Sequence, residues 1–464
     1  MSKGRAPAGE LAIVLHTHMP YVEGYGTWPF GEEWLWEAVA TSYLPLLQVL
    51  DPAGPVTVSV TPVLLDQLAA PGVGQRMATF LGDVRASTHA EDIVAATEPG
   101  VAAALESSAA DYAGAVSRLD ALGPGGMLAA LAPHAAWTSS ATHAVLPLLA
   151  CDAGVRLQLE AGVAAHRAHV AEARPWRGGL WLPECAYAPW LDALLAEAGV
   201  RRCCVDLTDV LGRGAPQQLR PIATPEGPVL MPIDRELVEA LWSAQGYPGA
   251  AAYRNYHGLT ANHHRAWAND GQVYDRARAA EQARADAADF VGRTVRRVAG
   301  GGLAVCALDT ELLGHWWFEG PIWLGAVLDE AERVGLRLTH LDDALERHEP
   351  ARAESVPDLG VTTWGTPRDL STWSGPRVAD LAFAARRAEL DVLEGTPDEA
   401  AVRELLALQS SDWAFLASGS LAGSYGRERA ALHLAGVERA LGGISSVTPR
   451  NLAVHASSAP LLAP

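Results

Sequence analysis

Residues 303–320 read LAVCALDTELLGHWWFEG, an apolar run followed at once by a cluster of acidic and aromatic residues. A short continuous apolar run is typical of a strand that is buried on both faces. Asp309 then stands at the carboxyl end of this strand, where barrel enzymes carry their catalytic groups. The stretch therefore predicts a parallel α/β architecture with a reactive carboxyl at Asp309.

Similar short apolar runs predict further strands at residues 10–15, 55–61, 179–182, 203–205 and 229–233. Between them, stretches such as 191–198 and 274–298 have helical character. Strands that alternate with helices indicate a mostly parallel sheet. Because chemically suggestive residues follow several of the strands, we expect a barrel with its site at the carboxyl ends of the strands.

Two regions interrupt the alternation of strands and helices, and they predict the domain organisation. We expect residues 1–350 to form a catalytic barrel with an Ala-rich helical insertion at about 67–145. Amphipathic helical patterns predict an α-helical C-terminal domain over residues 351–456 that completes the cleft. The small, Pro-containing residues 457–464 are expected to form a mobile tail.

The composition favours a protein that acts on a neutral ligand. The 464 residues carry a formal net charge of −19, which argues against nucleic acid or an anionic membrane as partner. The 15 tryptophans favour carbohydrate, since indole faces suit sugar rings, although core packing explains many of them equally well. Five scattered cysteines and an N-terminus without a long apolar run predict a cytoplasmic location.

His16 and His18 follow the first predicted strand in the motif His-Thr-His. This spacing would place both imidazoles on one face of a strand. Three interpretations stay open: a metal site, contacts of neutral imidazoles with sugar hydroxyls, and a hydrogen-bonded structural pair. No second His-x-x-x-His motif completes a zinc shell, and His263-His264 lies in a polar stretch.

Glu184 stands at the tip of the predicted strand 179–182, because Pro183 stops that strand. Trp181 and Tyr187 would give its carboxyl apolar walls that exclude water. Such a carboxylate can attack an anomeric carbon and hold the glycosyl group covalently. Cys185 has no evident base or helix N-terminus beside it, so a catalytic thiol is not expected.

The cluster after residue 308 supplies the second carboxyl. Asp309 comes first off the strand and is the best candidate for a general acid/base. Glu311 is expected to hold His315 or a loop amide, and Glu319 to begin the next helix as an N-terminal charge. Glycosidic chemistry needs one ionised and one protonated carboxyl across the bond, which the pair of Glu184 and Asp309 would provide.

Taken together, these stretches resemble glycoside hydrolase family 57. The matching segments, in chain order, are residues 16–20, 59–65, 141–149 with 181–187, 309–320 and 410–415. The resemblance implies a distorted (β/α)7 barrel with an inserted helical piece and a helical C-terminal domain. It also implies retention of configuration, no metal and no organic cofactor.

The resemblance also implies residue roles, with Glu184 as nucleophile and Asp309 as acid/base. Sugar-contact roles fall on His16, His18, Trp28, Trp364, Trp373 and Asp412. His143, inside the matching segment 141–149, and Trp316, beside the acidic cluster, are further expected substrate-binding residues. Trp364 and Trp373 match the aromatic pair that closes the family's cleft.

The chain departs from the family pattern between residues 234 and 274. Family branching enzymes usually carry a longer loop after the Gly-Tyr-Pro-Gly segment, here 246–249, and residues 234–243 are altered. In related enzymes a loop here carries a tyrosine that favours transfer over hydrolysis, and Tyr247 is the one substitute identified. The balance of branching, disproportionation and hydrolysis is therefore open.

The expected activity is that of a retaining transglycosylase that cleaves α-1,4 bonds and forms α-1,6 branches in glycogen, amylose or a specialised glucan. The alternatives are a 4-α-glucanotransferase or α-amylase-type hydrolase of the same family, a non-catalytic glucan-binding protein, and a metal-dependent polysaccharide deacetylase. A monomer is expected, with no nucleic acid or membrane partner.

Overall fold

The computed structural model describes residues 8–462, apart from 28–29, 124, 244, 354–355, 357–358, 396–397 and 445–450. Its strands are β1 (Glu10–Thr17), β2 (Thr57–Val60), β3 (Ala135–Ser139), β4 (Gly179–Trp181), β5 (Arg202–Val205), β6 (Ile222–Ala223), β7 (Val229–Pro232), β8 (Leu303–Asp309), β9 (Arg337–Leu338) and β10 (Ala351–Arg352).

The strands form one curled sheet in the order β10-β6-β7-β5-β4-β3-β2-β1-β8, with β9 beside β1. From β8 through β1 to β5 and β7, each strand runs parallel to its neighbour. Among the ten strands of the described residues, only the β6–β7 pair is antiparallel. Just after β7, the amide of Asp234 donates to the carbonyl of Val305 in β8 at 2.8 Å, so the two ends of the parallel set meet. The mostly parallel barrel expected from the sequence is confirmed.

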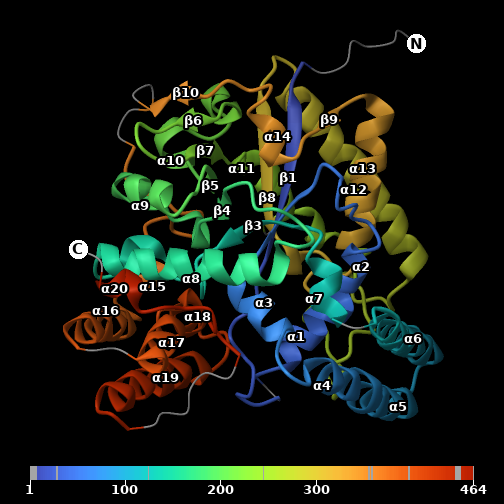
Figure 1. Cartoon of the computed structure of the whole chain (residues 1–464). Coiled ribbons are helices and arrows are strands. Elements are labelled where there is room, and N and C mark those ends of the chain that lie inside the picture. Colours follow the sequence, from blue (N-terminus) through green and yellow to red (C-terminus); the bar gives the residue numbers. More distant parts are fainter. Residues whose placement is uncertain are drawn as a thin grey trace.

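Helices surround this sheet (Figure 1). Those that follow the strands are α1 (Glu33–Ala38), α2 (Leu44–Leu46), α3 (Pro62–Leu68), α8 (Asp152–Val170), α9 (Asp192–Glu197), α10 (Thr208–Leu211), α11 (Arg235–Leu241), α12 (Arg276–Arg297), α13 (Gly320–Val334) and α14 (Leu341–Ala344). All eight residues of β1 are buried, as its apolar run requires. The helix α12 begins where the Asp275 carboxylate accepts hydrogen bonds from the amides of Ala277 and Arg278, a standard N-cap.

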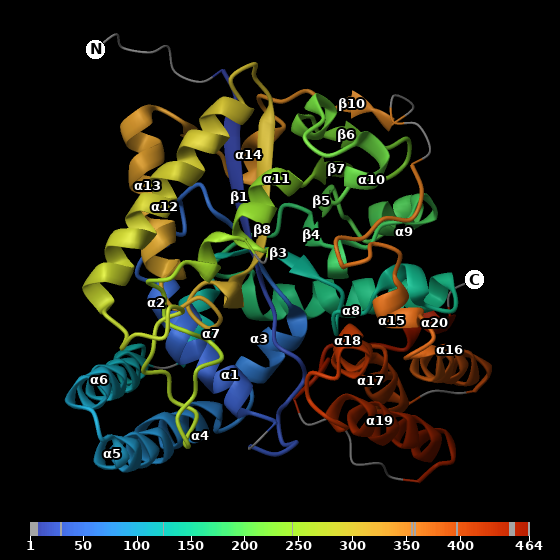
Figure 2. The same ribbon diagram turned by 180° about the vertical axis from the view of Figure 1, so that it is seen from behind.

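Two further groups of helices lie beyond the carboxyl ends of the strands, on opposite sides of the molecule (Figures 1 and 2). One is the insertion between β2 and β3, with α4 (Val73–Thr79), α5 (Arg85–Ala95), α6 (Pro99–Ala121) and α7 (Gly126–Leu131). The other is C-terminal, with α15 (Ser371–Ser374), α16 (Ala379–Glu394), α17 (Glu399–Leu408), α18 (Ser411–Gly419), α19 (Tyr425–Leu441) and α20 (Ala459–Leu462).

The structure corrects two local expectations. Residues 135–139, placed in the helical insertion by their alanines, form the central strand β3, because burial between β2 and β4 outweighs the weak local preference of five residues. The residues 457–462 of the expected mobile tail include α20, which packs on α8 with Leu461 buried. Residues 463–464 of that tail lie outside the described part of the chain.

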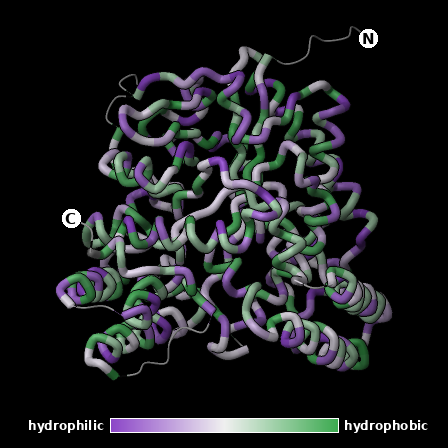
Figure 3. The backbone as a smooth tube through the Cα atoms, viewed as in Figure 1, coloured by the Kyte–Doolittle hydropathy of each residue, from purple (hydrophilic) through white to green (hydrophobic). Residues whose placement is uncertain are grey.

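Hydropathy follows this arrangement. Apolar residues gather along the central strands, whereas the outer helices alternate between apolar and polar residues (Figure 3). Among the described residues, no helix combines the length and the apolar character that crossing a membrane requires.

Candidate active site

The two predicted catalytic carboxyls come from strands on opposite sides of β1. Asp309 is the last residue of β8 and pairs in register with His16 of β1. Glu184 follows β4 in the short 3-10 turn Pro183–Cys185. Parallel strands present their carboxyl ends at one rim, so both side chains reach the same site, where the Asp309 charge acts on the Glu184 carboxyl.

The backbone is strained where the site is built. Glu184, Cys185 and His143 have φ angles of 60°, 48° and 59°, in the left-handed region that side chains with a Cβ rarely adopt. Such a conformation costs on the order of 1–3 kcal/mol per residue and persists where surrounding contacts enforce it. At Glu184 these contacts are hydrogen bonds to its carbonyl oxygen from the Trp364 amide at 3.0 Å and from the Thr363 hydroxyl at 2.8 Å.

The Glu184 carboxylate is itself oriented by neighbouring side chains. The indole Nε1 of Trp364 donates to its Oε2 at 3.2 Å, and Nδ1 of His143 lies 3.9 Å from its Oε1. Trp364 packs edge-on against Trp181, with ring centroids 5.0 Å apart. One carboxylate oxygen is therefore fixed by a donor from the C-terminal segment of the chain.

Three histidines and a tryptophan form a stack beside this carboxylate. The His16 ring lies on Trp181 with centroids 4.5 Å apart, and the His143 ring lies 5.0 Å from His16 and 4.1 Å from His18. Nε2 of His16 and Nε2 of His143 are 3.0 Å apart, so one imidazole donates to the other. His16 and His18 share one face of the strand, as their spacing predicted.

The helix α18 fixes the other end of this stack. Oδ1 of Asp412 lies 2.9 Å from Nε2 of His18, and Oγ of Ser411 lies 2.9 Å from Nδ1 of His143. Burial lowers the pKa values of His16 and His143, so both rings are neutral. Burial also opposes charge on His18, but the carboxylates of Asp412, Glu311 and Glu184 together outweigh it and raise the His18 pKa.

The side chains of His18, His143 and Asp412 could hold a metal ion, since their ligand atoms lie within 4.8 Å of one another. Two imidazoles and a carboxylate are a familiar zinc set. Here, however, His143 uses both ring nitrogens, toward His16 and Ser411, and His18 directs Nε2 at Asp412. We interpret the group as a hydrogen-bonded array.

Removal of metal ions should therefore leave the activity on glucan unchanged. After dialysis against a chelator, the rate on amylose is expected to stay within about 20% of the untreated rate, because no reacting group depends on a Lewis acid in this arrangement. A loss of rate that added zinc restores would show that the three side chains bind a catalytic metal.

Both catalytic carboxyls have raised pKa values. Burial, followed by the charge of Asp309, raises the pKa of Glu184 to about 8, and burial raises the pKa of Asp309 to about 6. Interacting carboxyls lose their protons in two steps that belong to the pair. Between these steps the pair holds one proton, which these values place mostly on Glu184 in the free protein. The form with that proton on Asp309 and the charge on Glu184 is the minor one, and it is the one suited to attack on a sugar.

A bell-shaped pH dependence of kcat/KM follows from these values. Below about pH 6 both carboxyls become protonated and the nucleophile is lost, and above about pH 8 both are ionised and the acid is lost. We expect the rate on amylose to be highest between these limits when measured from pH 4.5 to 9.5. A rate that keeps rising above pH 8.5 would contradict a shared proton.

Glu311 accepts hydrogen bonds from the Tyr43 hydroxyl at 2.5 Å and from the His18 amide at 3.2 Å. It thus holds a loop amide, as the sequence suggested, whereas His315 lies 3.3 Å from the Thr41 hydroxyl. The chain passes so close to Thr41 at Gly314 (φ 108°) that a Cβ there would overlap the Thr41 carbonyl oxygen.

The expected aromatic residues are distributed more widely than the sequence implied. Trp364 lies at the carboxyl pair, but Trp373 is 4% exposed and packs beside Val145, Ala186 and Leu370. Trp316 is 46% exposed and stacks on Tyr256 in a separate cavity. Trp28 lies outside the described residues.

Two contributors to the site were not predicted. Tyr43 reaches Glu311 from a helical segment without any motif, and Ser411, although it lies in the matching segment 410–415, had no predicted role. Tyr247, considered as the loop tyrosine, donates instead to the Asp289 carboxylate of α12 at 2.7 Å. It does not reach the carboxyl pair in this conformation of the loop.

Comparison with known proteins agrees with this arrangement. The sequence profile of Glycosyl hydrolase family 57 matches residues 136–357, and that of the 1,4-alpha-glucan branching enzyme C-terminal region matches residues 378–455. A 1,4-alpha-glucan branching enzyme of Thermococcus kodakarensis is 31% identical, with 92% of this chain and 72% of that protein covered. A probable 1,4-alpha-glucan branching enzyme of Mycobacterium tuberculosis is 32% identical, with 92% and 90% covered.

The fold agrees as well. The crystal structure of a GH57-type branching enzyme from Pyrococcus horikoshii matches with a TM-score of 0.88 and 27% identity, over 98% of this chain and 97% of that one. An α-amylase structure from Thermotoga maritima, at 23% identity and a TM-score of 0.76, shares the fold. From the matched profile, the identity to these relatives over 92% of this chain, and the common barrel, the chain belongs to glycosyl hydrolase family 57.

Proposed function

We propose that this chain is a retaining 1,4-α-glucan branching enzyme, which cleaves an α-1,4 bond and transfers the released segment to a 6-hydroxyl. The observation that carries the proposal is the pair of partly buried carboxyls, Glu184 and Asp309, which hold one proton between them near neutral pH. The relatives that cover the chain almost entirely and bear the name of branching enzymes support the choice of transfer.

In the first step the Glu184 carboxylate attacks the anomeric carbon as the glycosidic bond to that carbon breaks. Asp309 donates its proton to the departing 4-oxygen, so the leaving chain departs as a neutral hydroxyl. The product is a covalent glycosyl ester on Glu184. The Trp364 indole, which donates to Oε2 at 3.2 Å, keeps the carboxylate oriented for the attack.

In the second step the ionised Asp309 accepts the proton of an acceptor 6-hydroxyl. The 6-oxygen of that acceptor then attacks the same anomeric carbon, and the bond from this carbon to Glu184 breaks. Two inversions give net retention and an α-1,6 branch. Transfer prevails over hydrolysis only where a glucan reaches the ester more effectively than water does. Buried walls at Trp181 and His16 help to exclude water from the ester.

We further propose the binding roles of the surrounding side chains. The neutral imidazoles of His16 and His143 offer both a donor and an acceptor to sugar hydroxyls, and Asp412 with His18 offers a charged pair. Trp373 shapes the cleft from behind, since its ring packs on Gly365 next to Trp364. The sugar contact expected of Trp28 stays a proposal from the sequence.

The domain organisation, oligomeric state and location are proposals of the same kind. A catalytic unit over residues 1–350 with a helical C-terminal unit over 351–456 is consistent with α16 to α19, although β10 at Ala351–Arg352 still pairs with β6 of the sheet. We propose a cytoplasmic monomer that acts on glycogen, amylose or a specialised glucan.

The test is incubation with amylose, with α-1,6 linkages read by proton NMR and reducing ends measured in parallel. New branch signals with few new reducing ends support the proposal. Redistributed linear chains without branches would make the protein a 4-α-glucanotransferase, and reducing ends alone would make it a hydrolase. If the polymer does not change at any enzyme concentration, non-catalytic glucan binding would be the remaining candidate function.

A further inference from the structure

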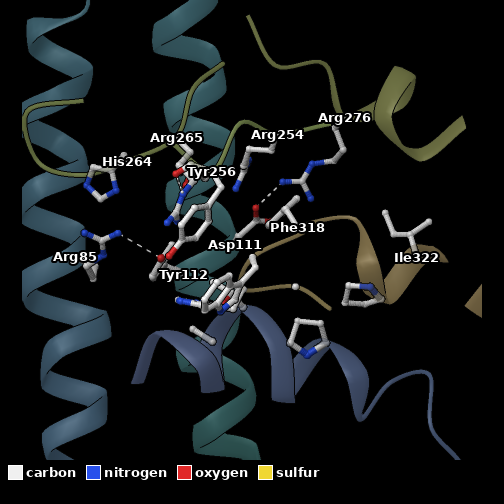
Figure 4. Close-up of a pocket in the computed structure, with 18 of the residues that line it drawn as sticks. Arg85, Asp111, Tyr112, Arg254, Tyr256, His264, Arg265, Arg276, Phe318 and Ile322 are labelled. Atoms are coloured by element: carbon white, nitrogen blue, oxygen red, sulfur yellow. Dashed lines mark hydrogen bonds and ion pairs between the residues drawn. The ribbon is translucent and has the colours of Figure 1, made fainter. Parts of the chain in front are cut away.

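A cavity that neither catalytic carboxyl lines is not explained by glucan cleavage. Its volume is about 310 Å³, close to the lower end of the size of ordinary small-molecule sites, roughly 300 Å³. Its walls come from α5, α6, the loop before α12 and the segment from Gly314 to Ile322 (Figure 4). Neither Glu184 nor Asp309 lines it.

Arginines dominate the polar lining of this cavity. They are Arg85, Arg118, Arg254, Arg265 and Arg276. The carboxylates that pair with them are Glu37, 2.9 Å from Arg85, and Asp111, 2.5 Å from Arg276. Among the described residues, Arg118, Arg254 and Arg265 form no ion pair with a carboxylate, so the cavity holds cationic groups in excess within a strongly acidic protein.

Arg254 is the residue that most strongly indicates a ligand in this cavity. Its side chain is 9% exposed, and its Nε and Nη2 have no hydrogen-bond partner among the described residues. The guanidinium lies 3.8 Å from the Phe318 ring centroid and 4.7 Å from that of Tyr274, faces that hold the group but accept no strong hydrogen bond. The neighbouring carboxylate of Glu319 accepts instead from the Arg254 backbone amide at 3.2 Å.

Buried donors without acceptors are rare in folded proteins, because each loses its hydrogen bonds to water. Burial accordingly lowers the Arg254 pKa, because it removes the guanidinium from water. Arg118 adds a second buried donor atom without a partner, its Nε, from α6. An oxyanion in the cavity would offset the charge of these two lining arginines, for which no carboxylate partner is seen among the described residues.

The remaining wall suits a sugar ring. Tyr256 and Trp316 stack with ring centroids 5.7 Å apart and an interplanar angle of 11°, and Trp316 is 46% exposed. Arg265 covers the other aromatic face, 4.3 Å from the Tyr256 centroid. A flat apolar surface beside unpaired arginines fits a ligand with a sugar at one end and an oxyanion at the other. A neutral glucan would leave the arginines unpaired.

We propose that this cavity binds a phosphorylated hexose, with its phosphate on Arg254 and Arg118 and its sugar ring against Trp316. The cavity volume admits one such molecule and not a polymer chain. Neither catalytic carboxyl lines this cavity, and the test of the proposal does not depend on the branching activity.

Titration calorimetry of the whole chain with glucose 6-phosphate tests the proposal, with glucose and inorganic phosphate as separate probes. We expect glucose 6-phosphate to bind tighter than inorganic phosphate and glucose not to bind here. Saturation with maltoheptaose, which occupies the glucan site, should change the Kd for glucose 6-phosphate less than twofold. Displacement by maltoheptaose, or equal binding of inorganic phosphate, would overturn the proposal.

Two substitutions locate the binding. Arg118→Gln and Arg254→Gln should each weaken glucose 6-phosphate about tenfold or more, since each removes a charge-assisted contact. Arg387→Gln, which alters an exposed arginine of α16, is the matched control and should leave the Kd unchanged. Arg118 is only partly buried, so its variant keeps the test valid if Arg254→Gln does not fold. Wild-type affinity in a folded Arg118→Gln variant would place the ligand elsewhere.

Discussion

Glu184→Gln should remove turnover of amylose, with kcat lower by at least about 10⁴-fold. An amide does not attack the anomeric carbon, so the covalent route is lost and only binding and positioning remain. The measurement is the initial rate of α-1,6 linkage formation and of reducing-end release, with high enzyme concentrations to detect residual activity. Glucan binding should persist, because the stacked histidines and Trp181 stay in place.

The thermal midpoint provides the control for this variant. The Glu184 pKa is raised from 4.5 to about 8, so the folded state disfavours the ionised carboxylate, and stability is lost as the pH rises from about 4.5 through 8. Glu184→Gln removes this group and should therefore not lower the midpoint at pH 7. A folded variant that retains more than a tenth of the wild-type rate would exclude Glu184 as the nucleophile.

Asp309→Asn should lower kcat on amylose by about 10²–10⁴-fold, since neither step receives proton transfer. The rate of the Asp309→Asn variant should depend strongly on the leaving group of the donor. A maltosyl fluoride donor needs no acid to depart, so its first step should recover and the glycosyl-enzyme should accumulate. Azide, which attacks without a base, should then restore turnover and yield a glycosyl azide of retained α configuration.

Asp206→Asn is a poor control, because Asp206 pairs with Arg235 in a buried contact. Asp329→Asn is a better one, since Asp329 is an exposed carboxylate of α13. This control variant should show the wild-type rate with amylose and with the maltosyl fluoride donor. If Asp309→Asn were equally slow with amylose and with the fluoride donor plus azide, its role would be structural and the general acid/base would have to be sought elsewhere, with Glu311 the next candidate.

The sequence by itself predicted most of the strands. The apolar runs at 10–15, 179–182 and 303–308 correspond to β1, β4 and β8, because burial on both faces leaves a local mark that a single sequence displays. The same apolar runs predicted that Asp309 and Glu184 stand at the carboxyl ends of strands. The amphipathic pattern at 274–298 likewise gave α12 within two residues.

Only the tertiary structure decided which distant residues meet. His143 reaches His16 across 127 residues, and Asp412 reaches His18 across 394, and no local pattern encodes such contacts. The strand β3 was hidden because its alanines favour a helix locally, whereas pairing on both edges favours a strand. Trp373 and Trp316 look alike in sequence, but packing buries the first in a core and leaves the second exposed in the arginine cavity. The local sequence determines which residues of a strand or helix are buried, whereas the closure of the sheet determines which distant residues meet at the ends of the strands.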